Sequence, residues 1–425
     1  MRSTLSNSGP PREAGFSARS KRVFVVSGKN PLTDPGGYAS YGYVVGECLT
    51  QLGYEVDLLA FGERDEEVRT AAGRIRTFGS RTVPRRTEFF PFWCRRFARE
   101  IHAALGEAEQ AVVHGVGPWS LAGVLAMRKN RRIKAVGSYF TTLRNEMFWL
   151  AKGVPINDYG LGPKARYQTA YLVVLLTLHP IERWALSRLE TVFVHYEYTR
   201  KLLERELGLR GRNLVMIPYA IDLQPKAALN MIPAAPADHP FEVLTVCRQE
   251  PRKGINYLLR AYRLLLDRGV TFHATVVGSG ALLEAHRKMT RRLGLDGSVE
   301  FPGFVPDLSR CLESANAFVL PSVQEGSGSI SLLEAMSYGL PVVVSACDGL
   351  PEDVQNGVSG LLVAPADPER LADALEALAR DAGLRSRLGR SAKEVYRTRF
   401  QPAAMRDALR DQYARLFPGA KGSGD

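Results

Sequence analysis

Cysteine is scarce in this 425-residue chain, and the cysteines that occur are far apart. None of the five belongs to a C-x-x-C pair or a mixed Cys/His cluster, which excludes the usual zinc sites and argues against a disulfide framework. This usage is typical of a reducing compartment, so we expect a cytoplasmic protein. The cysteines are Cys48, Cys94, Cys247, Cys311 and Cys347.

Long hydrophobic runs are also missing. The run from Tyr171 to Leu178 is far short of the roughly 20 apolar residues that a membrane-spanning helix needs. The first 20 residues are rich in Ser, Pro, Gly and Arg and have no continuous apolar stretch, so we expect a loose tail in place of a secretory signal. The sequence therefore predicts a protein that does not cross a bilayer.

Two motifs of phosphate and metal chemistry are absent. The chain has no Asp-x-Asp, so a divalent metal that bridges phosphates has no obvious carboxylate ligands. It also lacks the G-x-G-x-x-G fingerprint of dinucleotide-binding proteins. We therefore expect any phosphate to be held by backbone N–H groups and basic side chains, without a metal.

Acidic residues are under-represented in one half of the chain only. Residues 1–215 hold 32 Lys and Arg against 20 Asp and Glu, whereas residues 216–425 hold 24 of each, so the net charge of +12 belongs to the first half. One interpretation is an anionic partner for that half, either a membrane surface or a phosphate-bearing molecule. The alternative is a surface that only keeps the protein soluble. No nucleic-acid-binding motif accompanies the charge, so we expect no nucleic-acid partner.

What the chain does contain is a repeated alternation of strand, loop and helix over a length that suits two domains. The strand pattern Arg22–Ser27, a glycine-bearing loop, an amphipathic helix and the strand pattern Val56–Phe61 form one βαβ unit. A Pro- and Ala-rich stretch from Pro225 to Pro240 separates it from a second alternating region. The fold class predicted is therefore α/β, with two domains built on parallel sheets.

The stretch from Ala317 to Pro365 carries the clearest site. Two buried-strand patterns, Ala317–Leu320 and Pro341–Val344, flank a glycine loop and a helix that ends at Gly339. Such a loop presents unpaired N–H groups and the positive end of a helix dipole, so a phosphate is its natural occupant. The alternative is a turn without ligand, closed by a capping box from Ser331 to Glu334.

These residues resemble the donor-sugar motifs of the retaining glycosyltransferases of family 4, also called glycosyl transferases group 1. The pattern P-S-x-x-E-G-x-G is matched from Pro321 to Gly328, and L-E-A-M-x-x-G-x-P-V-V from Leu333 to Val343. The pattern G-x-x-E-x-V-x-x-G-x-x-G-x-L-V-x-P is matched from Gly349 to Pro365. Further towards the N-terminus, R-x-x-x-x-K-G is matched from Arg248 to Gly254.

The resemblance implies the GT-B architecture, in which two Rossmann-like lobes with parallel sheets face each other across a cleft. On this basis we expect a tail at 1–20, an acceptor-binding lobe at 21–222, a hinge at 223–240 and a nucleotide-sugar-binding lobe at 241–397. A final helix within 398–425 would return to the first lobe. The activity implied is retaining, metal-independent hexosyl transfer from a UDP- or GDP-sugar to a sugar-containing or lipid-linked acceptor, with no cofactor.

On the donor side, the resemblance assigns catalysis to Arg248, Lys253 and Glu325. The two cations would face the diphosphate as its charge grows, and Glu325 would contact sugar hydroxyls. Glu334 would contact the ribose. The family usually places seven residues between these two glutamates, whereas this chain has eight, which changes the placement of Glu325. The other donor-binding positions are Gly36, Gly37, Gly278, Val305, Gly326, Ser327, Gly328, Ser329 and Ile330.

On the acceptor side, His114 matches the V-V-H position of the family, although a lone histidine is more often structural. The histidine of the family's T-x-H is missing, and Ser138–Thr142 fill that place. We therefore expect other polar residues to serve the acceptor. They are Thr141, Thr142, Arg144, Asn145 and Glu146.

The segment Arg81–Arg99 mixes arginines with aromatic residues and allows two interpretations. Phe97, Ile101 and Leu105 recur at helical spacing, which favours a partly buried helix. The alternative is an interfacial segment with its rings in a membrane and its arginines on lipid phosphates. In that case the protein would be peripheral on the inner face of the membrane.

Two other classes of function remain open. One is a sugar-nucleotide epimerase or a glycosyl phosphorylase on a similar scaffold, although no motif marks a lysine for pyridoxal phosphate. The other is a catalytically silent protein that binds nucleotide sugars. Release of nucleoside diphosphate that depends on an acceptor would distinguish a transferase from both.

Overall fold

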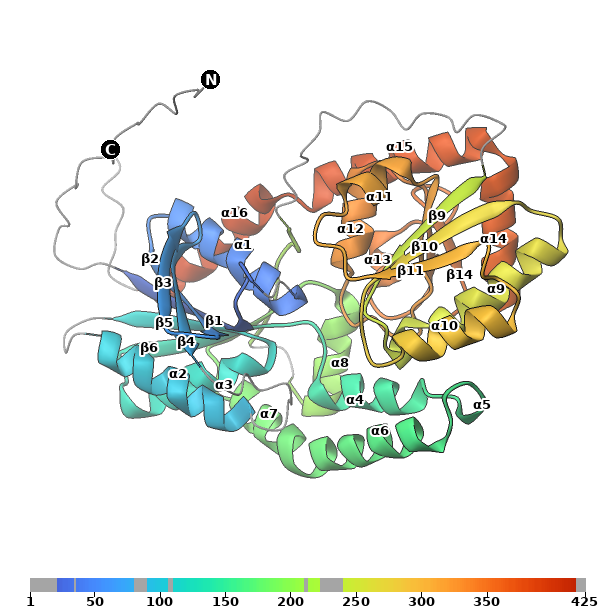
Figure 1. The fold of residues 1–425 in the computed structure, drawn as a ribbon. Helices are drawn as coiled ribbons and strands as arrows, with labels where there is room; N and C mark the ends of the chain where they lie inside the picture. Colours follow the sequence, from blue (N-terminus) through green and yellow to red (C-terminus); the bar gives the residue numbers. More distant parts are fainter. Residues whose placement is uncertain are drawn as a thin grey trace, which may run out of the picture.

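The computed structural model describes residues 21–33, 36–79, 90–105, 110–209, 213–221 and 240–417, and shows two α/β lobes, each built on its own sheet (Figure 1). The first lobe comprises the described residues up to 221, and the second lobe begins at residue 240. The expected tail at 1–20 lies outside the described residues, as does the expected hinge at 223–240 apart from its last residue.

The first sheet has eight strands in the order β3-β4-β2-β1-β5-β6-β7-β8. All neighbouring pairs are parallel except β3 and β4. Its central strands are buried apolar runs, as expected when helices cover both faces of a sheet. The strands are β1 (Arg22–Lys29), β2 (Glu55–Gly62), β3 (Glu66–Thr70), β4 (Gly73–Gly79), β5 (Ala111–Val116), β6 (Ile133–Tyr139), β7 (Thr191–Val194) and β8 (Leu214–Met216).

Helices connect these strands, and most lie against the sheet. An exception is the long connection between β6 and β7, which extends from the sheet towards the second lobe (Figure 1). Its helices are α4 (Leu143–Lys152), α5 (Ile156–Tyr159), α6 (Leu161–Val173), the π-helical turn η3 (Val174–Leu178) and α7 (His179–Leu186). The others are α1 (Gly37–Gln51), α2 (Phe90–Ala104), the short turn η2 (Gly117–Trp119), α3 (Ser120–Lys129) and α8 (Glu197–Leu207).

The second sheet has six parallel strands in the order β11-β10-β9-β12-β13-β14. They are β9 (Phe241–Val246), β10 (Phe272–Val277), β11 (Val299–Gly303), β12 (Ala317–Leu320), β13 (Val342–Ser345) and β14 (Leu361–Val363). The helices are the short turn η4 (Pro251–Lys253), α9 (Ile255–Asp267), α10 (Leu283–Arg292), α11 (Ser309–Ser314), α12 (Ile330–Ser337), α13 (Leu350–Asp353), α14 (Pro368–Arg380), α15 (Ala382–Arg399) and α16 (Pro402–Leu416). The predicted α/β class with two parallel-sheet lobes is confirmed.

The last two helices link the lobes. α15 packs on α12 of the second lobe, and α16 packs on α1 of the first lobe. One cluster of buried apolar side chains is continuous from the first sheet through α16 to the second sheet. The two lobes are therefore joined by a shared apolar core as well as by the chain connection.

The structure describes the helical part of the basic and aromatic segment. Trp93 and Phe97 of α2 are buried in the first lobe, and the Arg96 guanidinium lies over the Trp93 and Phe78 rings. These rings pack as the buried-helix interpretation predicts, whereas Phe92 and Arg95 are exposed, so an interfacial role of the segment stays a prediction. Arg85 and Arg86 lie outside the described residues. Within the described part of the chain, no helix combines the length and apolarity required to span a bilayer.

Candidate functional site

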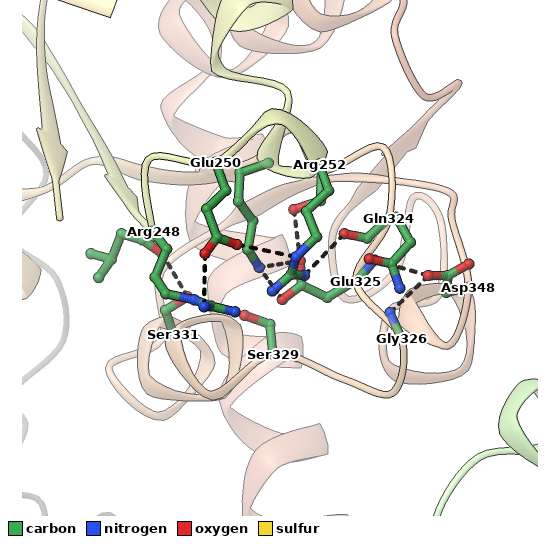
Figure 2. A network of polar contacts seen from close by, with 12 residues as sticks. Arg248, Glu250, Arg252, Gln324, Glu325, Gly326, Ser329, Ser331 and Asp348 are labelled. Atoms are coloured by element: carbon green, nitrogen blue, oxygen red, sulfur yellow. Dashed lines mark hydrogen bonds and ion pairs between the residues drawn. The ribbon is translucent and has the colours of Figure 1, made fainter. Parts of the chain in front are cut away.

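The carboxyl ends of three strands of the second sheet meet at one edge, and the loops that follow them form the site (Figure 2). The loop after β9 carries residues 247–254, the loop after β12 carries residues 321–329, and the loop after β13 carries residues 346–349. In open parallel sheets this edge is where ligands bind. The motif residues that the sequence places on separate loops are therefore neighbours in space.

Lys253 and Glu325 form a buried ion pair at the centre of the site. The Lys253 ammonium donates to both oxygens of Glu325, at 2.6 Å for Oε2, and the Ser322 hydroxyl donates to the same oxygen at 2.7 Å. Burial alone would raise the pKa of Glu325, but the nearby charges of Lys253 and Arg252 hold it below its usual range. Glu325 is therefore ionised, and its carboxylate faces Lys253.

Arg248 and Arg252 approach the site from either side of Glu250 (Figure 2). Arg248 donates to Glu250 at 2.7 Å, and its guanidinium is 4.0 Å from Glu146 of the first lobe, with most of the side chain exposed. Arg252 is buried, lies 3.3 Å from Glu250 and donates to the backbone oxygen of Gln324 at 3.4 Å. The R-x-x-x-x-K-G pattern did not mark Arg252, yet this arginine lies within the cluster of charges.

Asp348 occupies part of the backbone that was expected to hold phosphate. Its carboxylate accepts from the N–H groups of Glu325 at 2.9 Å and Gly326 at 2.7 Å. The residue has a left-handed backbone with φ of +50°, which Asp tolerates better than most residues. The expectation that Gly326 N–H binds an anion is therefore wrong for this state, because a carboxylate of the protein already holds that donor.

In the part of the chain that the structure describes, no side chain caps the first backbone N–H groups of α12. Ser329 is the N-cap residue but makes no side-chain capping bond, and Ser331 donates to Val246 O at 2.8 Å. The capping box from Ser331 to Glu334 is thus not formed. The N–H groups of Gly328, Ser329 and Ile330 have no hydrogen-bond acceptor within the described residues. They are available to an anion at the positive end of the helix.

Glu334 lies one turn further along α12. Its side chain is half-buried, and its carboxylate has no hydrogen-bond partner within the described part of the chain. Burial raises the pKa of Glu334 to about 7. A partly buried carboxylate without a partner favours a ligand that supplies hydroxyl donors.

The glycine loop after β12 is pressed against the first lobe. The Ser327 hydroxyl donates to Phe140 O and contacts the Thr199 hydroxyl, both at 2.6 Å. A Cβ atom on Gly328 would lie 2.1 Å from the Tyr196 hydroxyl, so only glycine fits beside this ring. Tyr196 in turn donates to Asp353 of α13 at 3.0 Å. The first lobe thus fixes the position of the loop.

On the first lobe, the N-terminus of α1 faces the same region. Gly36 is its N-cap residue without a side-chain cap, and a Cβ atom on Gly37 would meet nothing within 4 Å. The next residue, Tyr38, was not assigned a role from the sequence. Burial raises the pKa of its hydroxyl, as does the charge of Glu146, and Arg248 and Arg252 are close enough to oppose this.

Two of the expected acceptor residues have structural roles instead. His114 is fully buried, with its ring nitrogens 2.8 Å from the hydroxyls of Tyr413 and Ser138, and burial lowers its pKa to about 3. It ties α16 to the first sheet and cannot contact an acceptor. Thr142 is the buried N-cap of α4, where its hydroxyl accepts from Asn145 N at 3.0 Å.

The remaining expected acceptor residues stay near the cleft edge. Thr141 accepts from the Asn145 amide at 3.1 Å and lies beside Gly326. Arg144 is 3.6 Å from Glu206, with 40% of its side chain exposed. Glu146 approaches Arg248, so the two lobes meet here through opposite charges.

Gly278 and Val305 are placed differently from the other donor positions. Gly278 has φ of +130°, and a Cβ atom there would lie 2.0 Å from Cys247 O. Glycine is therefore required for the packing of the two loops that follow β9 and β10. Val305 is partly buried against the apolar core.

The short helix α5 of the first lobe docks on the second lobe. Asp158 accepts from Arg260 at 2.6 Å and from Asn256 at 2.9 Å, both on α9. The Tyr159 hydroxyl is 2.9 Å from His286 Nε2 on α10, and His286 Nδ1 is 2.7 Å from Gln249 Oε1. Gln249 is next to Arg248, so the docking of α5 reaches the loop that carries the cations.

Two family models match the chain one after the other. Residues 35–225 match the model for Glycosyltransferase Family 4, and residues 240–381 match the model for Glycosyl transferases group 1. The chain belongs to the family 4 (group 1) glycosyltransferases. This agrees with the motifs on both sides of the loop cluster.

Solved structures confirm the GT-B fold of this family 4 chain. Sucrose-phosphate synthase from Thermosynechococcus elongatus superposes with a TM-score of 0.72 at 23% identity, over 94% of this chain and all of that chain. HepE of Anabaena, solved with UDP-glucose, gives a TM-score of 0.69 at 16% identity, over 93% of this chain and 99% of that chain. At these identities the likeness concerns the fold.

Sequence relatives match over part of the chain only. The putative colanic acid biosynthesis glycosyltransferase WcaL of Escherichia coli is 36% identical over 34% of this chain and 37% of its own length. D-inositol 3-phosphate glycosyltransferase of Frankia alni is 39% identical over 42% of this chain and 46% of its own length. The matched segments thus span less than half of these relatives.

The buried pair of this family 4 chain gives a first prediction. Lys253→Met should lower the free energy of unfolding by about 3 kcal/mol or more, because it leaves the Glu325 carboxylate buried without its main counter-charge. The double variant Lys253→Met/Glu325→Gln should regain much of that loss. Urea unfolding at neutral pH measures both changes.

The matched control for this cycle is Arg263→Met with Asp267→Asn, because that pair is exposed on α9. Each control substitution should cost less than about 1 kcal/mol. If the loss of unfolding free energy in the double variant equals the sum of the losses from Lys253→Met and Glu325→Gln measured separately, the two charges do not stabilise each other. The same conclusion would follow if these losses were as small as those of the control.

Proposed function

We propose that this protein is a retaining hexosyltransferase that uses a nucleoside diphosphate sugar and needs neither a metal nor a cofactor. The bond between the anomeric carbon and the diphosphate oxygen breaks, and the acceptor hydroxyl oxygen bonds to that carbon on the same face. The hydroxyl proton leaves with the nucleoside diphosphate. The protein must therefore stabilise a diphosphate whose negative charge increases.

One observation carries this proposal: Arg248, Lys253 and the free N–H groups of Gly328–Ile330 converge on one edge of the second sheet. Two cations and a helix N-terminus around one space suit a diphosphate better than any neutral ligand. In this arrangement Glu325 orients Lys253. UDP and UDP-glucose complexes of HepE, which shares the fold, support a nucleotide sugar as the donor.

Glu334 completes the donor site in the proposal. A ribose presents two adjacent hydroxyl groups, which can donate to both oxygens of a carboxylate. Glu334 lies on the same helix as the open N–H groups, one turn away from them, and has no described hydrogen-bond partner of its own. The ribose and the diphosphate of one nucleotide would therefore lie along α12.

We assign the acceptor to the first lobe, where Thr141, Arg144, Glu146 and Tyr38 border the cleft. Relatives named for colanic acid and lipopolysaccharide core biosynthesis support a carbohydrate acceptor, free or linked to lipid. The basic character of residues 1–215 favours an anionic one. We accordingly propose that the protein works in the cytoplasm, at the membrane surface when its acceptor is held there.

The leading test measures acceptor-dependent release of nucleoside diphosphate from UDP-, GDP- and ADP-sugars. Arg248→Ala should reduce this turnover by about a hundredfold, because a preorganised charge that faces the leaving group is removed. Its thermal midpoint should stay unchanged, because the side chain is mostly exposed. Arg263→Ala, also exposed on the second lobe, should change neither quantity.

Three results would contradict the proposal. Wild-type turnover in Arg248→Ala would remove the diphosphate assignment. Turnover of the donor without any acceptor and without free diphosphate would indicate an epimerase. Tight binding of a nucleotide sugar with no product for any acceptor would indicate a silent binding protein.

Glu334 gives a prediction on pH. Its pKa is raised to about 7 by burial, and ribose hydroxyls stabilise the ionised form, so nucleotide affinity should increase as pH rises from about 6 to 8. Calorimetric titration with UDP should show this increase in the wild type. Glu334→Gln should bind more weakly and with a flatter pH profile. An identical pH profile in both proteins would show that Glu334 does not face the ribose.

A further inference from the structure

The helix α6 and the turn η3 form an exposed apolar face on the first lobe. No residue of α6 is buried, although the helix has 13 residues. Leu161 is 70% exposed, Leu172 53% and Leu176 74%, and Val173 is also exposed. We call these four residues the α6 face. Exposed leucines in such a row are uncommon on a monomer and mark an interaction surface.

The α6 face follows the helix over several turns. The residues at 161, 165, 168, 172 and 176 recur at intervals of three or four, so they lie along one side, and all are exposed. From Leu161 to Leu176 this side extends about 22 Å. The helix lies at the lower edge of the molecule in Figure 1, and α4 packs on its inner side.

The charged side chains of the segment 161–188, which includes the α6 face, are mainly cationic. Between residues 161 and 188 the sequence has four cations, Lys164, Arg166, Arg183 and Arg188, and a single carboxylate, Glu182. Glu182 is buried and accepts from the backbone N–H of Leu143. Arg166, Arg183 and Arg188 are exposed. The surface of this segment is therefore apolar and cationic, with no exposed carboxylate.

We propose that the α6 face docks on a lipid bilayer surface that carries anionic headgroups. Leucines that enter the headgroup region beside arginines that contact lipid phosphates are the usual composition of an interfacial helix. The membrane partner inferred from the charge of the first half is thereby assigned to α6 and η3, which expose four apolar side chains, whereas α2 buries Trp93 and Phe97 and exposes Phe92.

A second copy of the chain fits this surface less well. In a two-fold dimer the same patch meets itself, so Arg166 and Arg183 would face the same cations of the partner. No exposed carboxylate between 161 and 188 would compensate them. Anionic lipid headgroups provide the missing opposite charge, and the apolar region of the bilayer accommodates the leucine side chains.

The position of the face gives docking a role, and this part of the inference rests on the proposed function. α6 packs on α4, which carries Arg144 and Glu146 at the cleft edge. Lys164 of α6 donates to Ala151 O of α4 at 2.8 Å, which ties the two helices together. A membrane under α6 would therefore hold a lipid-linked acceptor close to the acceptor side of the cleft.

The test is co-sedimentation with vesicles, which requires neither donor nor turnover. The full chain should bind vesicles of phosphatidylcholine with phosphatidylglycerol at low salt, bind them less at high salt, and bind pure phosphatidylcholine weakly. Leu172→Gln/Leu176→Gln should lower the partition coefficient by about tenfold or more, because both apolar contacts are lost. Arg166→Gln/Arg183→Gln should also lower it by about tenfold or more.

Two controls separate this effect from misfolding and from general charge. Arg387→Gln/Arg390→Gln removes two exposed cations from α15 of the second lobe and should leave vesicle binding unchanged. UDP binding should be the same in all variants, because none of these residues is at the donor site. Loss of UDP binding in the wild type would count against the proposed function and not against the α6 face.

Three outcomes would overturn the inference. One is equal binding to neutral and anionic vesicles. Another is anionic binding that survives Leu172→Gln/Leu176→Gln. The third is a dimer, measured by light scattering, that this double substitution separates into monomers.

Discussion

The contact between the glycine loop after β12 and Tyr196 of the first lobe is the constraint on which the site depends. Gly328 lies so close to the Tyr196 hydroxyl that any side chain would collide with it, and Gly349 packs on the same ring. Ser327 adds hydrogen bonds to Phe140 and Thr199. Glu352 of α13 accepts from the first two N–H groups of α8. The donor loop of the second lobe is therefore placed by the first lobe.

Around this loop the charges compensate one another before any ligand arrives. Glu325 is held by Lys253, Glu250 lies between two arginines, and Asp348 is held by two backbone N–H groups. Burial would otherwise make each carboxylate unfavourable as an ion. Lys253 and Arg252 are buried beside these carboxylates, and a cation in a buried position acts more strongly on a diphosphate than one in water. α5 is connected to the loop of Arg248 in the same way, because Tyr159 contacts His286 and His286 contacts Gln249.

Much of the second lobe could be predicted from the sequence, because its motifs are local. The strand, glycine loop and helix from Ala317 to Ser337 are fixed by short-range patterns, and Arg248 and Lys253 follow from a spacing of five residues. Asp348, Arg252 and Tyr38 were missed, since their roles depend on contacts between loops that are far apart in the chain. His114 was misplaced for the same reason, because its partner Tyr413 is 299 residues away. The α6 face also required the structure, because periodicity does not show which side of a helix is left uncovered.

We infer that a nucleoside diphosphate binds between the loop after β9 and the start of α12. The most direct test is a crystal structure of the protein with UDP, or with the diphosphate that stabilises it best. In that complex the β-phosphate should lie within hydrogen-bond distance of Arg248, Lys253 and the N–H groups of Gly328–Ile330, with the ribose hydroxyls on Glu334. A diphosphate bound away from these groups would contradict this inference, as would a complex in which Lys253 contacts Glu325 alone.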